Sequence, residues 1–128
     1  DSKVSINFEP SQKSLYINLL TGYFKFLFKS GDMIQRAHIS TPNGKIETNN
    51  SSLLISYSPL FARTSVLNYK GSSLFFKRNR TTGDEIQLVK DDYSVLEKRS
   101  ETPTSPESFP RAKENSLKEL FKVKNTEP

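Results

Sequence analysis

The stretch that decides the fold runs from Ile39 to Phe76 and contains ISTPNGKIETNNSSLLI at 39–55 and TSVLNYKGSSLFF at 64–76. Short apolar runs alternate here with residues that favour turns, chiefly Pro, Gly, Asn and Ser, a pattern typical of β-strands joined by tight connections. No catalytic constellation interrupts it. The stretch therefore predicts an all-β single domain of many short antiparallel strands, in the form of a sandwich, barrel or roll.

Toward the N-terminus, the segment Ser14–Lys29 carries the clearest strand signal. Its apolar residues recur at every second position, which places them on one face of a strand. In the second half of the segment Phe24, Phe26 and Phe28 share one face, and Lys25 and Lys29 share the other. Thr21-Gly22 lies between the halves, so we expect a half-buried hairpin that turns at this glycine. A long helix is disfavoured by the aromatic content and the central Gly.

Further turns are expected at three places along the chain. Thr41-Pro42-Asn43-Gly44 predicts a tight reversal, because proline fixes φ and Asn-Gly tolerates left-handed backbone. Lys70-Gly71 predicts a hairpin between strands at Arg63–Tyr69 and Ser73–Lys77. Asp91-Asp92 predicts a turn before a final strand.

The composition of the 128 residues restricts the chemistry. The length fits about one domain, and the absence of Cys excludes disulfides and thiol chemistry. A single His without Cys disfavours a zinc site, and we expect no cofactor or metal. The formal charge of +5 permits contact with nucleic acid, anionic glycan or lipid headgroups without selecting one of them. No apolar run is long enough for a transmembrane segment. The chain opens on Asp1 and shows no signal peptide, which is compatible with removal of an upstream signal or anchor.

The composition changes near residue 100, and we expect three parts: a β domain at 3–99, a Pro/Ser/Thr linker at 100–110 and a helical tail at 111–128. In the tail, Leu117, Leu120 and Phe121 have the i, i+3, i+4 spacing of an apolar helix stripe. A helix this short is marginal alone, so we expect it to dock either on its own β domain or on a partner.

The order of the apolar steps resembles the FecR-like domain of bacterial envelope proteins. That family shows an L-x-x-G-x-φ element, a T-P-x-G-x-φ step, a G-T-x-F-x-V strand and a T-x-V-x-V-x-x-G segment, where φ is apolar. The similar stretches here are LLTGYF at 19–24, TPNGKI at 41–46, NSSLLI at 50–55 and TSVLNYKG at 64–71. The resemblance covers roughly residues 14–97. Asn50-Ser51 replaces the Gly-Thr pair, and Tyr69-Lys70 stands where an acidic residue usually precedes the glycine.

The resemblance implies a β-rich, extracytoplasmic domain, periplasmic or in the cell envelope, that relays or scaffolds by protein contact. Some relatives are iron-uptake signal transducers that contact a sigma factor and an outer-membrane receptor. We therefore expect a non-enzymatic recognition or signalling-scaffold module that binds an envelope protein or a cell-wall glycan such as peptidoglycan. Its oligomeric state is left open.

Basic residues near aromatic ones give the main alternative, a small basic β domain that binds single-stranded nucleic acid or anionic lipid. The candidate anion- or partner-binding residues are Lys77, Arg78, Arg80, Lys25 and Lys29. We favour the simpler interpretation that the aromatics point inward and the lysines form the wet face of the same strands. His38 and the acidic pairs Asp84-Glu85 and Asp91-Asp92 have no evident catalytic partners, so we expect no catalytic residue.

Overall fold

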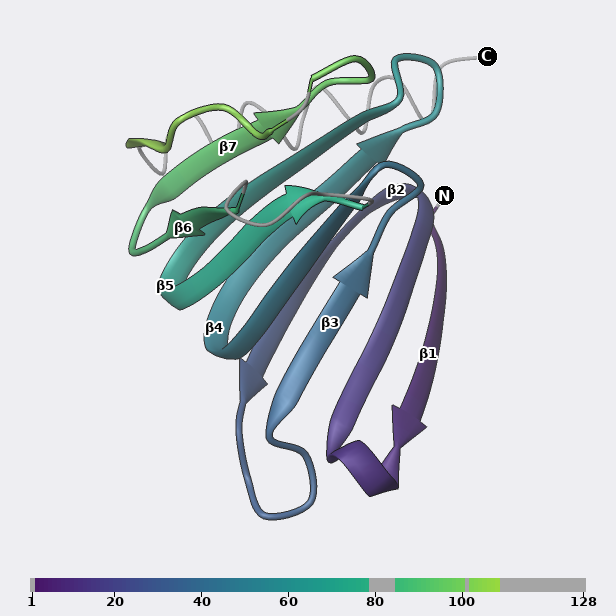
Figure 1. Ribbon diagram of the computed structural model, residues 1–128, viewed down its shortest axis with the longest axis vertical. Coiled ribbons are helices and arrows are strands. Elements are labelled where there is room, and N and C mark those ends of the chain that lie inside the picture. Colours follow the sequence, from purple (N-terminus) through teal and green to yellow (C-terminus); the bar gives the residue numbers. More distant parts are fainter. Residues whose placement is uncertain (1, 79–84, 101, 109–128) are drawn as a thin grey trace.

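The computed structural model describes residues 2–78, 85–100 and 102–108, which form one eight-stranded mixed sheet (Figure 1). The all-β prediction is confirmed. The elements are β1 (Lys3–Glu9), the 3-10 turn η1 (Pro10–Gln12), β2 (Ser14–Lys29), β3 (Arg36–Ser40), β4 (Gly44–Ser58), β5 (Arg63–Lys77), β6 (Ile86–Leu88), β7 (Asp92–Leu96) and β8 (Glu107–Ser108). Their hydrogen-bonded order is β1-β2-β3-β4-β5-β7-β8, with β6 also on β5.

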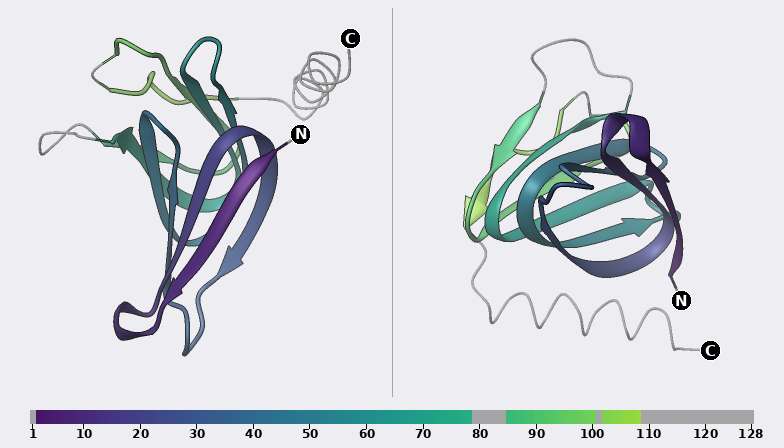
Figure 2. Two further views of the ribbon diagram at one scale, coloured as in Figure 1. Left: turned by 90° about the vertical axis from the view of Figure 1, so that its right-hand side faces the viewer. Right: turned by 90° about the horizontal axis from the view of Figure 1, so that it is seen from below.

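The sheet curls on itself because β2 pairs with two different strands. Its first half runs parallel to β3, with Ile17 opposite Ile39, and its second half runs antiparallel to β4, with Phe24 opposite Ile55. Since β3 also pairs with β4, the three strands form a closed circuit of hydrogen bonding. Figure 2 shows the result, a roll in which β2 passes from one side of the molecule to the other.

Two of the hairpin predictions are wrong. The chain does not turn at Thr21-Gly22 or at Lys70-Gly71, because β2 and β5 each continue through these positions as single long strands. Both glycines have left-handed backbone, with φ of 93° at Gly22 and 72° at Gly71. The ladder shifts register near each of them, so the glycines serve as bends within a strand rather than as turns between strands.

The reversal at Thr41–Gly44 is confirmed and joins β3 to β4. The backbone N–H of Thr41 donates to the carbonyl oxygen of Gly44 at 2.9 Å, and the N–H of Gly44 donates to Thr41 Oγ1 at 2.9 Å. The Asp91-Asp92 turn is confirmed too. Asp91 has a φ of 63°, and Asp92 Oδ2 accepts a hydrogen bond from the Val89 N–H at 2.8 Å.

The core lies inside the roll, where the alternating apolar residues of the long strands meet. It consists of Ile17, Leu19, Ile39, Ile46, Leu53, Ile55, Tyr57, Val66, Phe75, Leu88 and Leu96, with Phe24 and Phe26 packed against it. Phe75 is fully buried and is the largest of these completely enclosed side chains. Burial of one such large apolar side chain contributes about 1.5–3 kcal/mol to folding, which makes this cluster the main stabilising feature of the fold.

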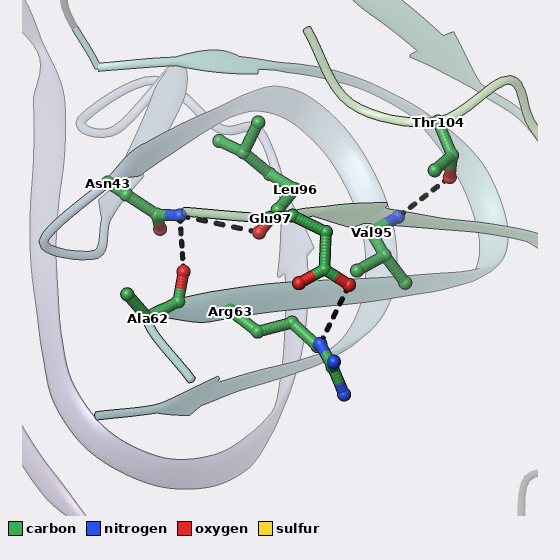
Figure 3. A network of polar contacts seen from close by, with 7 residues as sticks. All are labelled: Asn43, Ala62, Arg63, Val95, Leu96, Glu97 and Thr104. Atoms are coloured by element: carbon green, nitrogen blue, oxygen red, sulfur yellow. Dashed lines mark hydrogen bonds and ion pairs between the residues drawn. The ribbon is translucent and has the colours of Figure 1, made fainter. Parts of the chain in front are cut away.

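One end of the roll is closed by a polar network that the Asn43 side chain organises (Figure 3). Its amide nitrogen donates to the carbonyl oxygens of Ala62 at 2.8 Å and Leu96 at 3.3 Å. Beside it, Arg63 Nε lies 2.9 Å from Glu97 Oε1. The β3–β4 turn, the start of β5 and the end of β7 are therefore tied together.

Part of the segment expected as a linker lies along β7. The N–H of Val95 donates to Thr104 Oγ1 at 3.0 Å, the N–H of Thr104 donates to the Val95 carbonyl oxygen at 2.9 Å, and Glu107 pairs with Tyr93. The expected helical tail at 111–128 lies outside the described residues. The three-part division of the chain stays a prediction.

Candidate functional site

A strip of side chains crosses the outer face of the sheet from β2 to β6. Tyr16 pairs with His38, His38 with Glu47, Glu47 with Leu74, and Leu74 with Gln87. These five residues, which we call the cross-strand strip, lie on one face because registered partners in neighbouring strands share a face. On β2, β3 and β4 they alternate with the buried Ile17, Ile39 and Ile46, so the strip faces away from the core.

The first three residues of the strip are in direct contact. The rings of Tyr16 and His38 stack with centroids 4.8 Å apart and planes inclined by 11°. The Tyr16 hydroxyl donates to Gln12 Oε1 at 2.6 Å, and His38 Nδ1 lies 3.7 Å from Glu47 Oε2. The strip therefore presents an aromatic surface whose orientation is fixed by these contacts, with the Glu47 carboxylate beside it.

Burial lowers the pKa of His38 below its ordinary value. The nearby Glu47 carboxylate acts in the opposite direction, while the positive charges of Arg36 and Lys45 lower the pKa further. The imidazole is therefore neutral at pH 7, and its contact with Glu47 is not an ion pair there. The ring acts as a stacking and hydrogen-bonding group rather than as a fixed cation.

Two polar clefts lie next to the strip and share Arg36 and Asn49. The first, of about 350 Å³, is lined by Arg36, Glu47, Thr48, Asn49, Ser72, Ser73, Leu74 and Gln87. The second, of about 660 Å³, is lined by Gln12, Ser14, Ser30, Gly31, Asp32, Gln35, Arg36 and Asn49. Within the described ranges no hydrogen bond or ion pair engages the Arg36 guanidinium, which leaves its donors open to a ligand or partner.

The chemistry of this region suits recognition. The clefts present amide and hydroxyl groups, the carboxylates of Glu47 and Asp32, and an open guanidinium, which together suit the hydroxyl and charged groups of a partner. In the part of the chain that the structure describes, no group of three or more His, Asp or Glu side chains is placed to hold a metal ion. Asp92 of the predicted acidic pair caps its own turn, and Asp84 lies outside the described residues.

The structure distributes the predicted basic residues instead of gathering them. Lys25 lies on β2, and its Nζ is 4.8 Å from the centroid of the Tyr69 ring. Lys25 pairs with Leu54 of β4, which pairs with Leu67 of β5, so Lys25 and Leu67 lie in the same row across the sheet. Lys77 stands about ten positions further along β5, or roughly 33 Å of extended strand. Arg78 follows it, with its N–H bonded to the Asn43 carbonyl oxygen at 3.0 Å, while Lys29 ends β2.

The aromatic neighbours of the lysines face inward. Phe24 and Phe26 pack against the core, and Phe28 is buried, whereas Lys25 and Lys29 are exposed. This arrangement agrees with the interpretation that the aromatic side chains point inward and the lysines of the same strands face solvent. Arg80, Leu117, Leu120 and Phe121 lie outside the described residues, so their predicted roles stay predictions.

Sequence reasoning did not identify Tyr16, Arg36 or Glu47 as candidates. A signal existed, since each is a polar or amphipathic residue next to a buried position of a strand. Their convergence depends on the parallel pairing of β2 with β3, however, and this contact between distant halves of the roll leaves no local mark in the sequence.

Comparisons with known proteins support the fold. No family model matches the chain, and no curated protein matches it. Among solved structures, two crystal structures of a "putative anti-sigma factor" from Parabacteroides distasonis are similar, with TM-scores of 0.68 and 0.69 and 8% sequence identity in each case. Each match covers 91% of this chain and 53% of the other, so this chain spans about half the length of those proteins. The chain therefore shares the fold of a part of these proteins.

Proposed function

We propose that this chain is the non-enzymatic recognition part of a signalling protein of the FecR-like class. It acts outside the cytoplasm and binds another envelope protein, and the cross-strand strip with Arg36 forms the contact surface. The observation that carries the proposal is the match of 91% of the chain to part of a protein described as an anti-sigma factor. A regulator of that kind acts by binding another protein.

The surface chemistry supports this role. Tyr16 supplies a ring that is already held in place by His38 and Gln12, so little conformational entropy is lost when a partner packs on it. Tyrosine and arginine are the residue types that contribute most often to protein interfaces. Arg36 stands beside the strip with its guanidinium unengaged within the described part of the chain.

A cell-wall glycan is the second candidate ligand, and the two clefts favour it. Their amide and hydroxyl lining matches the hydroxyl groups of a saccharide, and the neighbouring Tyr16 ring offers an apolar face. Binding to single-stranded nucleic acid or anionic lipid has less support. A stacking platform needs exposed rings beside the cations, and the phenylalanines next to Lys25 and Lys29 face inward.

A binding comparison tests the proposal with the full 128-residue chain. The probes are peptidoglycan sacculi, a single-stranded oligonucleotide and anionic phospholipid vesicles, each at about 50 and 200 mM salt, because phosphate-driven binding falls steeply over this range. We expect weak binding to the oligonucleotide and vesicles at both salt concentrations. Tight oligonucleotide or vesicle binding that collapses at the higher salt would overturn the proposal.

Binding to the sacculi distinguishes between the two favoured ligand classes, a cell-wall glycan and an envelope protein. Retention that tolerates salt and is lost in Arg36→Ala assigns the surface to a glycan, whereas no retention excludes peptidoglycan and leaves the protein partner as the proposal. Lys98→Ala is the matched control, because it removes one exposed cation that follows β7 and lines neither cleft.

A further inference from the structure

The strand β1 lies at one edge of the sheet (Figure 1). Among the strands that the structure describes, β1 is hydrogen-bonded to β2 alone, from Lys3 opposite Thr21 to Glu9 opposite Ser14. Backbone N–H and C=O groups on the other side of an edge strand point away from its neighbour and can pair with a further strand. The seven residues of β1 offer roughly 23 Å of such an edge.

The apolar pattern of the core continues onto β1, but the burial does not. Val4 and Ile6 lie opposite Leu19 and Ile17, so all four side chains share the face that carries the core. Leu19 and Ile17 are 0% and 2% exposed, whereas Val4 and Ile6 are 39% and 67% exposed. The edge therefore presents apolar side chains to solvent beside a strand that can still pair.

Both ends of β1 are fixed by hydrogen bonds. At the start, Ser2 Oγ donates to the carbonyl oxygen of Tyr23 at 2.6 Å and accepts from its N–H at 3.0 Å. At the end, the turn η1 is closed by the N–H of Lys13, which donates to the carbonyl oxygen of Pro10 at 3.2 Å. Because the strand is already held in place, little conformational entropy is lost when another strand pairs with it.

The sequence of β1, KVSINFE, is complementary to itself in antiparallel order. With Ile6 opposite its own copy, the pairs are Lys3 with Glu9, Val4 with Phe8, and Ser5 with Asn7. Opposite charges and apolar side chains directly across from each other stabilise paired strands, and like charges destabilise them. A parallel copy in the same register would instead set Lys3 against Lys3 and Glu9 against Glu9. The charges therefore favour a second copy of this chain in antiparallel pairing.

The features that protect edge strands from pairing are missing from the middle of β1. Natural sheets protect their edges with proline, with bulges or with a charged side chain, especially lysine. The charged residues of β1 lie only at its two ends, and the strand contains no proline. Its register against β2 is regular from Val4 to Glu9.

We propose that two copies of the chain pair antiparallel through β1, about a twofold axis at Ile6, so that the two rolls share one continuous sheet. Since each copy uses the same residues, the contact closes at a dimer and does not extend into a filament. In the dimer Asn7 lies opposite Tyr16 of its own copy and opposite Ser5 of the other, so the two cross-strand strips lie on one face. The pairing rests on β1 and is independent of the function proposed for the strip.

Disulfide formation at an introduced cysteine tests the pairing in the full 128-residue chain, which has no native cysteine. Directly opposite residues of antiparallel strands have Cα atoms about 4.5–5.5 Å apart, within the range of a disulfide. Under mild oxidation we expect Ile6→Cys to form a covalent dimer at least about tenfold faster than Leu27→Cys, because pairing raises the local concentration of the two thiols. Leu27 is the matched control, since it is 81% exposed and random collisions would favour it over Ile6. Equal or faster crosslinking through Leu27→Cys would overturn the proposal.

Charge reversal tests the antiparallel register by sedimentation equilibrium at about 50 mM salt, where exposed charges are only partly screened. Lys3→Glu sets like charges opposite each other at both ends of the contact and should raise the dimer Kd about fivefold or more. Adding Glu9→Lys restores opposite charges and should return the Kd to the original value. Lys90→Glu, the same change at an exposed residue outside β1, should leave the Kd unchanged.

Two results of the sedimentation experiment would overturn the proposal. One is an unmodified chain that stays monomeric up to about 1 mM, which corresponds to a dimerisation free energy weaker than about −4 kcal/mol. The other is a Kd that Lys3→Glu leaves unchanged or that Glu9→Lys does not restore.

Discussion

The side-chain amide of Asn43 donates a hydrogen bond to the backbone carbonyl oxygen of Leu96, at 3.3 Å and across 53 positions of sequence. Its second donor contact, to the Ala62 carbonyl oxygen at 2.8 Å, joins the same side chain to the β4–β5 connection. One residue of a tight turn thus links three parts of the chain at one end of the roll. A residue that looks local in the sequence has a long-range structural role.

Asn43→Ala should lower the free energy of unfolding by about 1–3 kcal/mol, because two backbone carbonyls and the buried Thr64 hydroxyl each lose a hydrogen bond, although the Thr64 hydroxyl keeps its contact with the Thr41 hydroxyl. Urea denaturation followed by far-UV circular dichroism measures the change. Asn7→Ala is the control, since Asn7 is exposed on β1, and it should change the stability by less than about 0.5 kcal/mol. Equal midpoints for the two variants would show that the network does not stabilise the fold.

Gly71→Ala should destabilise the protein by more than about 2 kcal/mol, since the left-handed backbone alone costs an L-residue about 1–2 kcal/mol. A Cβ at this position would also clash with the backbone carbonyl oxygen of Asn50. Gly31→Ala is the matched control, because a Cβ there meets nothing within 4 Å. Thermal unfolding of both variants checks the prediction, and similar melting temperatures would contradict the bend assigned to Gly71.

The pH dependence of stability should include a contribution from His38. Burial lowers its pKa in the folded state, so between the folded and unfolded pKa values the unfolded chain binds more protons. This contribution is fully present above the unfolded value of about 6.5 and is lost as the pH falls below it. His38→Gln should flatten the change in stability between about pH 7.5 and 5.5 relative to the unmodified chain. Denaturation midpoints across this range measure it, and identical slopes would rule out the assignment.

Much of the fold is predictable from local patterns. The alternation in Ser14–Lys29, the reversal at Thr41–Gly44 and the Asp91-Asp92 turn all depend on neighbouring residues, and the structure contains each of them. The bends at Gly22 and Gly71 were misjudged because a glycine with positive φ fits either a turn or a bulged strand. Tertiary pairing decides between these two.

The candidate site was harder to predict for a related reason. Tyr16 and His38 stack because the first half of β2 pairs with β3 after the chain has curled around the core. Such a contact depends on the summed bending of long strands rather than on a motif. The basic residues were visible in the sequence, but their separation along β2 and β5 was not.

Site-specific photocrosslinking in living source cells tests the central claim most directly. A benzophenone amino acid replaces Tyr16 in the cross-strand strip, and in the control it replaces Leu27, an exposed residue on the other half of β2. We predict one discrete protein of the envelope fraction crosslinked through position 16 and not through position 27, with loss of the product in Arg36→Ala. Crosslinking of position 16 to nucleic acid, or to the same proteins as position 27, would contradict recognition through this surface.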